Sequence, residues 1–95
     1  MAAGTPAGKR LVLRLYVAGR GPNSVIAIAN LRAICASDFA EHTLEIVDVL
    51  TQPARAVADG VIVTPTLLKL SPRPQQRVIG NLSDTSLVRL TLARK

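Results

Sequence analysis

Leu11-Val12-Leu13-Arg14-Leu15-Tyr16-Val17-Ala18 is the most informative stretch of this chain. Its side chains are apolar on both alternating faces except at Arg14, a pattern typical of a strand buried in the middle of a sheet. The residues that follow, Gly19 to Pro22, interrupt the apolar run. Pro22 suits the first position of a helix, because the N–H that proline lacks has no partner there. This stretch therefore predicts a central strand that leads into a helix.

The predicted helix runs from about Pro22 to Ser37, and a second strand follows from Thr43 to Leu50. At 100° per residue, the apolar residues Ala27, Ile28, Leu31, Ile34 and Cys35 fall on one side of that helix. A strand, a helix and a second strand in this order form a right-handed unit with parallel strands. The first half of the chain is thus predicted to be an α/β domain with a βαβ core.

The next segments predict a short helix over 54–58, an apolar strand over 61–70 interrupted by Pro65, and a short strand over 76–80. A βαβ unit, a strand preceded by proline, a hairpin and a last helix make a thioredoxin-like arrangement. Thr64-Pro65 falls where such folds place a cis-proline.

The C-terminal segment fits two structures. Ser83 and Asp84 can cap a final helix. With period two, however, residues 88–94 alternate between apolar and polar side chains, which favours a strand.

Length and composition indicate one domain, residues 9–95, behind a flexible arm over 1–8. Apolar types make up 48% of the 95 residues and charged types 19%, which is enough apolar material for a core. The N-terminus lacks a charged start followed by an apolar stretch, and no apolar run approaches the ~20 residues of a membrane span. We therefore expect a cytoplasmic protein that does not bind a membrane.

The residue types leave little chemistry for catalysis. One cysteine and one histidine exclude a disulfide framework, a cysteine-rich zinc site and a cluster of histidines around a metal. Residues 19–24, where thioredoxin-like redox enzymes carry a Cys-x-x-Cys pair, contain no cysteine. Cys35 lies on the apolar side of the predicted helix, so we expect a buried, inert thiol; an oxidoreductase that uses Cys35 alone is the enzymatic alternative. We expect no enzymatic activity, no metal and no cofactor.

The charge balance points instead to an acidic partner. The net charge is +6, and Lys69, Arg73 and Arg77 bracket a proline-rich turn, where they could form a patch that binds carboxylates. Nucleic acid is disfavoured as the partner, because the only aromatic residues, Tyr16 and Phe39, are remote in sequence from these cations.

Several motifs together resemble the KaiB family of circadian clock proteins. The resemblance runs from about Arg10 to Asp84, in the family's order and with near-identical spacing. It rests on Leu15-Tyr16-Val17-Ala18-Gly19, Pro22-Asn23-Ser24, Val47-Asp48-Val49-Leu50 with Gln52-Pro53, Thr64-Pro65-Thr66-Leu67, and Val78-Ile79-Gly80-Asn81-Leu82-Ser83-Asp84.

This resemblance implies a non-enzymatic protein that binds the KaiC ATPase ring and opposes its phosphorylation, together with KaiA and a sensor histidine kinase. It also implies two folds. One is a resting homotetramer or homodimer; the other is a thioredoxin-like monomer, in which the chain after the second strand is rebuilt. Lys69 and Arg77 match basic positions of the family, and we add Arg73 as a third candidate contact. Structural or switch roles are expected for Thr64, Pro65, Gly80 and Ser83.

The chain also departs from the family. Thr91-Leu92-Ala93 replaces the usual Gly-Leu-Asp, and Thr favours strands more than Gly does. We therefore predict the oligomeric resting form, with a strand near residues 87–93. The alternative function is a thioredoxin-like adaptor or sensor module in KaiC-linked or histidine-kinase stress signalling, without a full clock.

Overall fold

The structure, a computed structural model, describes residues 10–93. The predicted arm over residues 1–8 lies outside the described residues. In chain order the elements are β1 (Leu11–Val17), α1 (Pro22–Asp38), β2 (His42–Asp48), α2 (Pro53–Ala58), β3 (Thr66–Ser71), β4 (Gln76–Ile79) and α3 (Thr85–Ala93). None of the helices within these residues is both long and apolar enough to cross a membrane.

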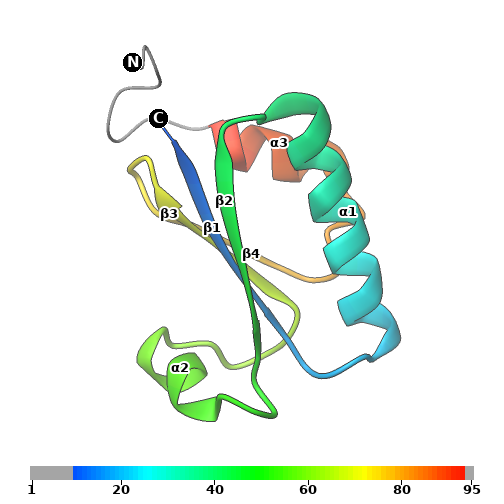
Figure 1. Cartoon of the computed structure of the whole chain (residues 1–95), viewed down its shortest axis with the longest axis vertical. Helices are drawn as coiled ribbons and strands as arrows, with labels where there is room; N and C mark the ends of the chain where they lie inside the picture. The colour runs from blue at the N-terminus through cyan, green and yellow to red at the C-terminus, as the bar shows by residue number, and fades with distance from the viewer. Residues whose placement is uncertain (1–9, 94–95) are drawn as a thin grey trace.

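The four strands form one sheet in the order β2-β1-β3-β4 (Figure 1). Strand β1 pairs in parallel with β2 and antiparallel with β3, and β3 pairs antiparallel with β4. The predictions of a central first strand and of a parallel βαβ unit are confirmed. This is a mixed α/β, thioredoxin-like fold.

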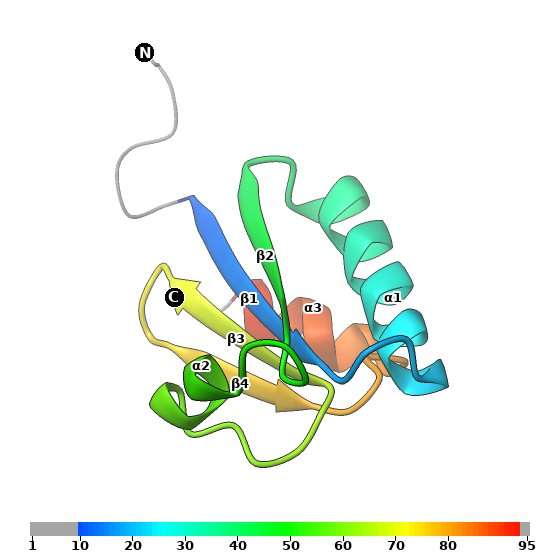
Figure 2. The same cartoon turned by 60° about the horizontal axis from the view of Figure 1, so that its bottom comes forward.

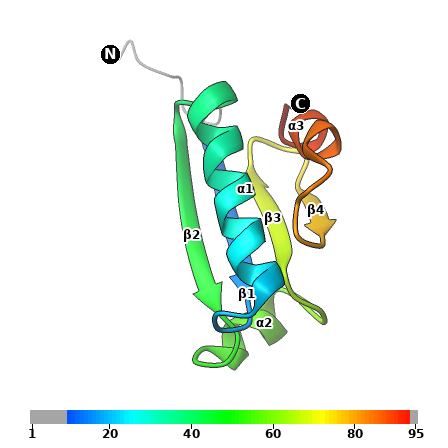
Figure 3. The same cartoon turned by 90° about the vertical axis from the view of Figure 1, so that its right-hand side faces the viewer.

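The helices cover the two faces of the sheet unequally. Helices α1 and α3 lie on one face, and the short α2 lies on the other (Figures 2 and 3). The larger core cluster lies between the sheet and the α1/α3 layer: Leu11, Leu13, Leu15, Val17, Ala27, Leu31, Ile34, Cys35, Leu67, Leu82, Val88 and Leu92. The smaller cluster, on the α2 side, contains Tyr16, Val47, Ala56 and Leu68. Strand β1 contributes to both clusters, because alternate side chains of a strand point to opposite faces.

The apolar run over 61–70 is only partly a strand, contrary to the prediction. The strand begins at Thr66, which pairs with Tyr16 near the end of β1. Residues 61–63 form a loop that joins α2 to β3, and Ile62 is 94% exposed. Since proline donates no backbone hydrogen bond, the ladder does not extend back through Pro65.

The prediction of a strand near residues 87–93 is wrong, because the structure has helix α3 there. Val88 and Leu92, one helical turn apart, are both buried against the larger core. Asp84 Oδ1 accepts the backbone N–H of Leu87 at 3.2 Å, which caps the first turn of the helix. Capping and burial at positions i and i+4 therefore outweigh the two-residue alternation.

Candidate functional site

The β3–β4 hairpin carries two of the three predicted partner-binding residues at the surface. Arg73 lies in the turn between the strands and Arg77 lies in β4, and both are exposed. This arrangement suits contact with acidic groups of another protein.

The third predicted residue, Lys69, does not share that surface. Arg77 is paired with Leu68, which belongs to the α2-side cluster. Lys69 is next in the strand and therefore lies on the opposite face, in register with Leu13 of the larger core. Its residue surface is only 1% exposed. The fold thus buries Lys69, whereas the two arginines are exposed.

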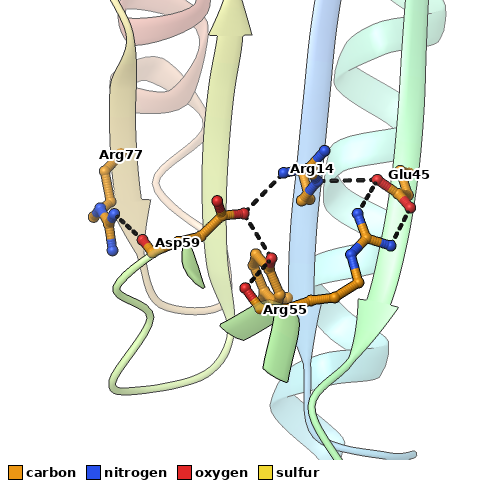
Figure 4. A network of polar contacts seen from close by, with 6 residues as sticks. Arg14, Glu45, Arg55, Asp59 and Arg77 are labelled. Carbon is orange, nitrogen blue, oxygen red and sulfur yellow. Dashed lines mark hydrogen bonds and ion pairs between the residues drawn. The ribbon is translucent and has the colours of Figure 1, made fainter. Parts of the chain in front are cut away.

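Arg77 makes specific contacts with the end of α2. Its Nη2 donates to the backbone carbonyl of Asp59 at 2.7 Å, and its Nη1 donates to that of Gly60 at 3.1 Å (Figure 4). A depression of about 390 Å³ lies beside these contacts, between α2 and the two strands of the hairpin. Its lining includes Ala58, Leu68, Gln76 and Arg77, and Lys69 borders it as well although it is almost wholly buried.

Asp59 also joins Arg77 to a network on the α2 side of the sheet, which we call the polar cluster (Figure 4). Its members are Arg14, Tyr16, Glu45, Arg55, Asp59 and Arg77. Arg14 bonds both carboxylates, Glu45 at 2.9 Å and Asp59 at 2.8 Å. Arg55 donates to both carboxylate oxygens of Glu45, from Nη1 to Oε2 at 2.5 Å and from Nη2 to Oε1 at 2.8 Å. The hydroxyl of Tyr16 donates toward Asp59 at 2.6 Å.

The polar cluster holds its two carboxylates in the charged form. Hydrogen bonds from Arg55 and then Arg14 lower the pKa of Glu45 to about 2. Hydrogen bonds from Tyr16 and then Arg14 lower the pKa of Asp59 as well. Burial, followed by the bond to Asp59, raises the pKa of Tyr16. These shifts stabilise ion pairs and move none of the three groups toward neutral pH, where an acid or base catalyst works best.

Cys35 and His42, the one cysteine and the one histidine of the chain, lie outside the polar cluster and have structural roles. Cys35 is fully buried, and burial raises the pKa of its thiol, in line with the expected inert cysteine. His42 begins β2, and its Nδ1 lies 2.7 Å from the carbonyl oxygen of Phe39. Within residues 10–93, no three His, Cys, Asp or Glu side chains are placed to hold a metal ion.

Two of the predicted switch residues meet at the end of the β3–β4 hairpin. The N–H of Gly80 donates to the carbonyl of Pro65 at 2.9 Å, and Gly80 has φ 118°, a conformation that favours glycine. The Thr64–Pro65 peptide bond is cis. Ser83 is exposed, and its N–H donates to the side chain of Asn81. A role of these residues in switching stays a prediction.

Several exposed apolar side chains flank α2 in the chain. Val57 lies on the helix, Leu50 precedes it, and Ile62 and Val63 lie in the loop that follows. Because Arg77 contacts Gly60, this loop begins next to the exposed arginine of β4. Apolar side chains beside exposed cations are a common composition for a protein-binding surface.

Comparison with known proteins gives a consistent set of relatives. The KaiB domain family matches residues 14–94. The chain is 49% identical over 84 residues to the circadian clock protein KaiB3 of Synechocystis sp., which covers 87% of this chain and 82% of that protein. It is 45% identical over 87 residues to the circadian clock oscillator protein KaiB of a Prochlorococcus marinus strain, covering 90% and 83%.

Solved structures with the same fold include the N-terminal domain of SasA and several thioredoxins. The N-terminal domain of Synechococcus elongatus SasA superposes with a TM-score of 0.73 at 27% identity, over 90% of this chain and 84% of that one. Thioredoxin from Fasciola hepatica superposes with a TM-score of 0.72 at 20% identity, over 90% and 82%. The thioredoxin likeness establishes the fold alone.

Proposed function

The chain belongs to the KaiB family of circadian clock proteins, and we propose that it binds a KaiC-type ATPase ring and opposes the phosphorylation of that ATPase. The observation that carries the proposal is the 45–49% identity to KaiB proteins over most of the chain. In this proposal the protein acts in the cytoplasm, without catalysis or a cofactor. KaiA and a sensor histidine kinase are the further partners.

We propose that the partner-binding surface lies on the α2 side of the sheet. Arg73 and Arg77 supply exposed positive charge, and Val57 and Ile62 supply exposed apolar area. Long-range attraction of an acidic partner speeds association, while desolvated apolar contacts slow dissociation. Lys69 would join this surface only in a form of the chain that exposes it.

We further propose that the thioredoxin-like fold is the partner-binding form and that a homotetramer or homodimer of different topology is the resting form. Residues 85–93 support a second topology, since their pattern satisfies both a helix and a strand. Two packings separated by a few kcal/mol are a known mechanism of switching. Thr64, Pro65, Gly80 and Ser83 are the proposed switch residues.

The proposal is tested by incubating the purified chain with a KaiC-type ATPase in the presence of ADP or ATP, then sizing the mixture. We expect co-elution and a lower phosphorylation level of the ATPase. Charge reversal of both Arg73 and Arg77 should abolish co-elution, whereas reversal of Arg32 on α1 should leave it intact. Failure of the unmodified chain to bind with either nucleotide would refute the proposal.

A second candidate is a thioredoxin-like adaptor or sensor module that works without a full clock. The likeness to the N-terminal domain of SasA favours it, because that domain has the fold seen here. Sizing separates the two candidates. An adaptor of this kind stays a thioredoxin-like monomer over a wide concentration range, whereas a switching protein converts to an oligomer as concentration rises.

A further inference from the structure

We propose that the polar cluster is a latch that fastens residues 53–63, called here the α2 segment, to the sheet. When the latch opens, the α2 segment detaches as one unit while the sheet and the α1/α3 layer stay folded. The undocking is a property of the isolated chain and does not depend on the proposed function.

The α2 segment has little apolar anchorage of its own. Ala56 is the only buried residue of α2 and Val61 is partly buried against the same smaller cluster, whereas Val57 and Ile62 are exposed. A helix of six residues is also far too short to be stable in isolation. Polar contacts with the sheet therefore add to a small apolar contact in holding α2 in place.

Those contacts converge on the α2 segment from three strands (Figure 4). From strand β1, Arg14 and Tyr16 both donate hydrogen bonds to the carboxylate of Asp59. The Tyr16 hydroxyl also lies 2.8 Å from the carbonyl oxygen of Arg55. From strand β2, Glu45 accepts hydrogen bonds from Arg55. From strand β4, Arg77 donates to the backbone carbonyls of Asp59 and Gly60. The attachment thus combines ion pairs with hydrogen bonds to backbone carbonyls of Arg55, within the helix, and of Asp59 and Gly60, just after it.

Glu45 is the member on which the latch most depends. Its carboxylate binds a guanidinium of the α2 segment, Arg55, and a guanidinium of the sheet, Arg14. Loss of its charge weakens both ion pairs and leaves two cations facing each other. Its side chain is 44% exposed, so water can replace the lost contacts and the effect stays local.

The rest of the fold has a different anchorage. The α1/α3 side of the sheet is packed by twelve buried residues of one continuous apolar cluster. Elements fixed mainly by partly exposed polar contacts open at lower free energy than those fixed by a buried core. The α2 segment should therefore be the first part of the described chain to open.

The latch also links the α2 segment to partner binding, and this link rests on the proposed function. Arg77 is both a candidate partner contact and a donor to the end of α2. A partner carboxylate that binds the Arg77 guanidinium competes with the carbonyls of Asp59 and Gly60. Binding of a carboxylate at Arg77 would then loosen the α2 segment, and by linkage a looser segment would bind that carboxylate more tightly.

Native-state hydrogen exchange tests the latch on the isolated chain. The reporters are the backbone N–H groups of Asp59, Gly60 and Val61, which bond within the α2 segment, and that of Val49, which bonds to Val17. In Glu45→Gln we expect the three segment amides to exchange about fivefold faster or more, with Val49 unchanged. The matched control is Glu41→Gln, since Glu41 pairs only with Arg10 among the ion pairs of residues 10–93 and lies outside the cluster.

Tyr16→Phe gives an independent reading, because it removes one hydroxyl of the cluster and keeps the buried ring. It should accelerate the same three amides. The latch is refuted if the segment amides exchange as in the unmodified chain, or if the Val49 amide accelerates by the same factor. Neither outcome depends on a partner, so a failure of the proposed function leaves the test of the latch intact.

Discussion

Lys69 and Arg77 lie on opposite faces of the sheet. The register of β3 and β4 places Arg77 opposite Leu68, on the side of α2, and so turns Lys69 toward the face that α1 and α3 cover. The two cations therefore differ in environment as well as direction: Arg77 is exposed, whereas Lys69 is buried. Charge reversal at the two positions should have different consequences.

Lys69→Glu should destabilise the fold, whereas Arg77→Glu should mainly weaken partner binding. A carboxylate in place of buried Lys69 lacks the partners built for a cation, and we expect a loss of about 3 kcal/mol in the free energy of unfolding. Arg77→Glu should change that free energy by less than about 1 kcal/mol. Urea unfolding measures both, with Arg32→Glu as a surface control. Equal midpoints for Lys69→Glu and the unmodified chain would contradict the burial.

The polar cluster predicts a specific dependence of stability on pH. The pKa of Glu45 is lowered from 4.5 to about 2 in the folded chain. A carboxylate with a depressed pKa contributes stability that is fully present above its unfolded pKa and is lost as the pH falls through the folded pKa. The contribution of Glu45 should therefore be complete at pH 7 and disappear between about pH 4.5 and pH 2.

Urea unfolding at pH 6, 4 and 3 measures this contribution against Glu45→Gln, which cannot titrate at that position. Since Glu45 is partly exposed, we expect the variant to be less stable by about 1 kcal/mol or less at pH 6, with the difference shrinking toward pH 3. Glu41→Gln should show no such convergence. A difference between Glu45→Gln and the unmodified chain that grows on acidification would contradict the assignment.

Most of the first half of the fold can be predicted from the sequence, because two periodicities there are unambiguous. The doubly apolar stretch over 11–18 becomes the central β1, and the apolar side of residues 22–37 becomes the buried side of α1. Residues 61–63 are mispredicted because an apolar run does not reveal whether a neighbouring strand is available to pair with it. Ile62 lies beyond the part of β1 that pairs with β3.

The candidate site is harder to predict, because it depends on register. Lys69 and Arg77 are close in sequence, yet they lie on opposite faces of the sheet because Arg77 pairs with Leu68 and not with Lys69. The polar cluster leaves one trace in the sequence. Arg14 interrupts an apolar strand, and Glu45 occupies the matching position in β2. Asp59 and Arg55 carry no such signal, because their contacts are set by the placement of α2 in three dimensions.

Cys35 should be protected from modification in the folded chain. It lies in the larger core with no exposed surface, and burial raises the pKa of its thiol, so little thiolate is present at pH 8. We expect a thiol reagent to react at least about 100-fold more slowly with the native chain than with the chain in urea. Fast reaction under native conditions would revive the alternative of a cysteine-dependent oxidoreductase.

Three alanine variants of α3 distinguish the helix from a strand over the same residues. In the helix, Val88 and Leu92 are buried, and Leu90 is 72% exposed. A strand would place all three on one face, because they alternate in sequence. Val88→Ala should therefore lower the free energy of unfolding by about 2 kcal/mol and Leu92→Ala by a similar amount, while Leu90→Ala changes it by less than about 0.5 kcal/mol. Urea unfolding of dilute protein, where an oligomer is disfavoured, is the measurement. An effect of Leu90→Ala as large as that of Val88→Ala would show that the strand form dominates in solution.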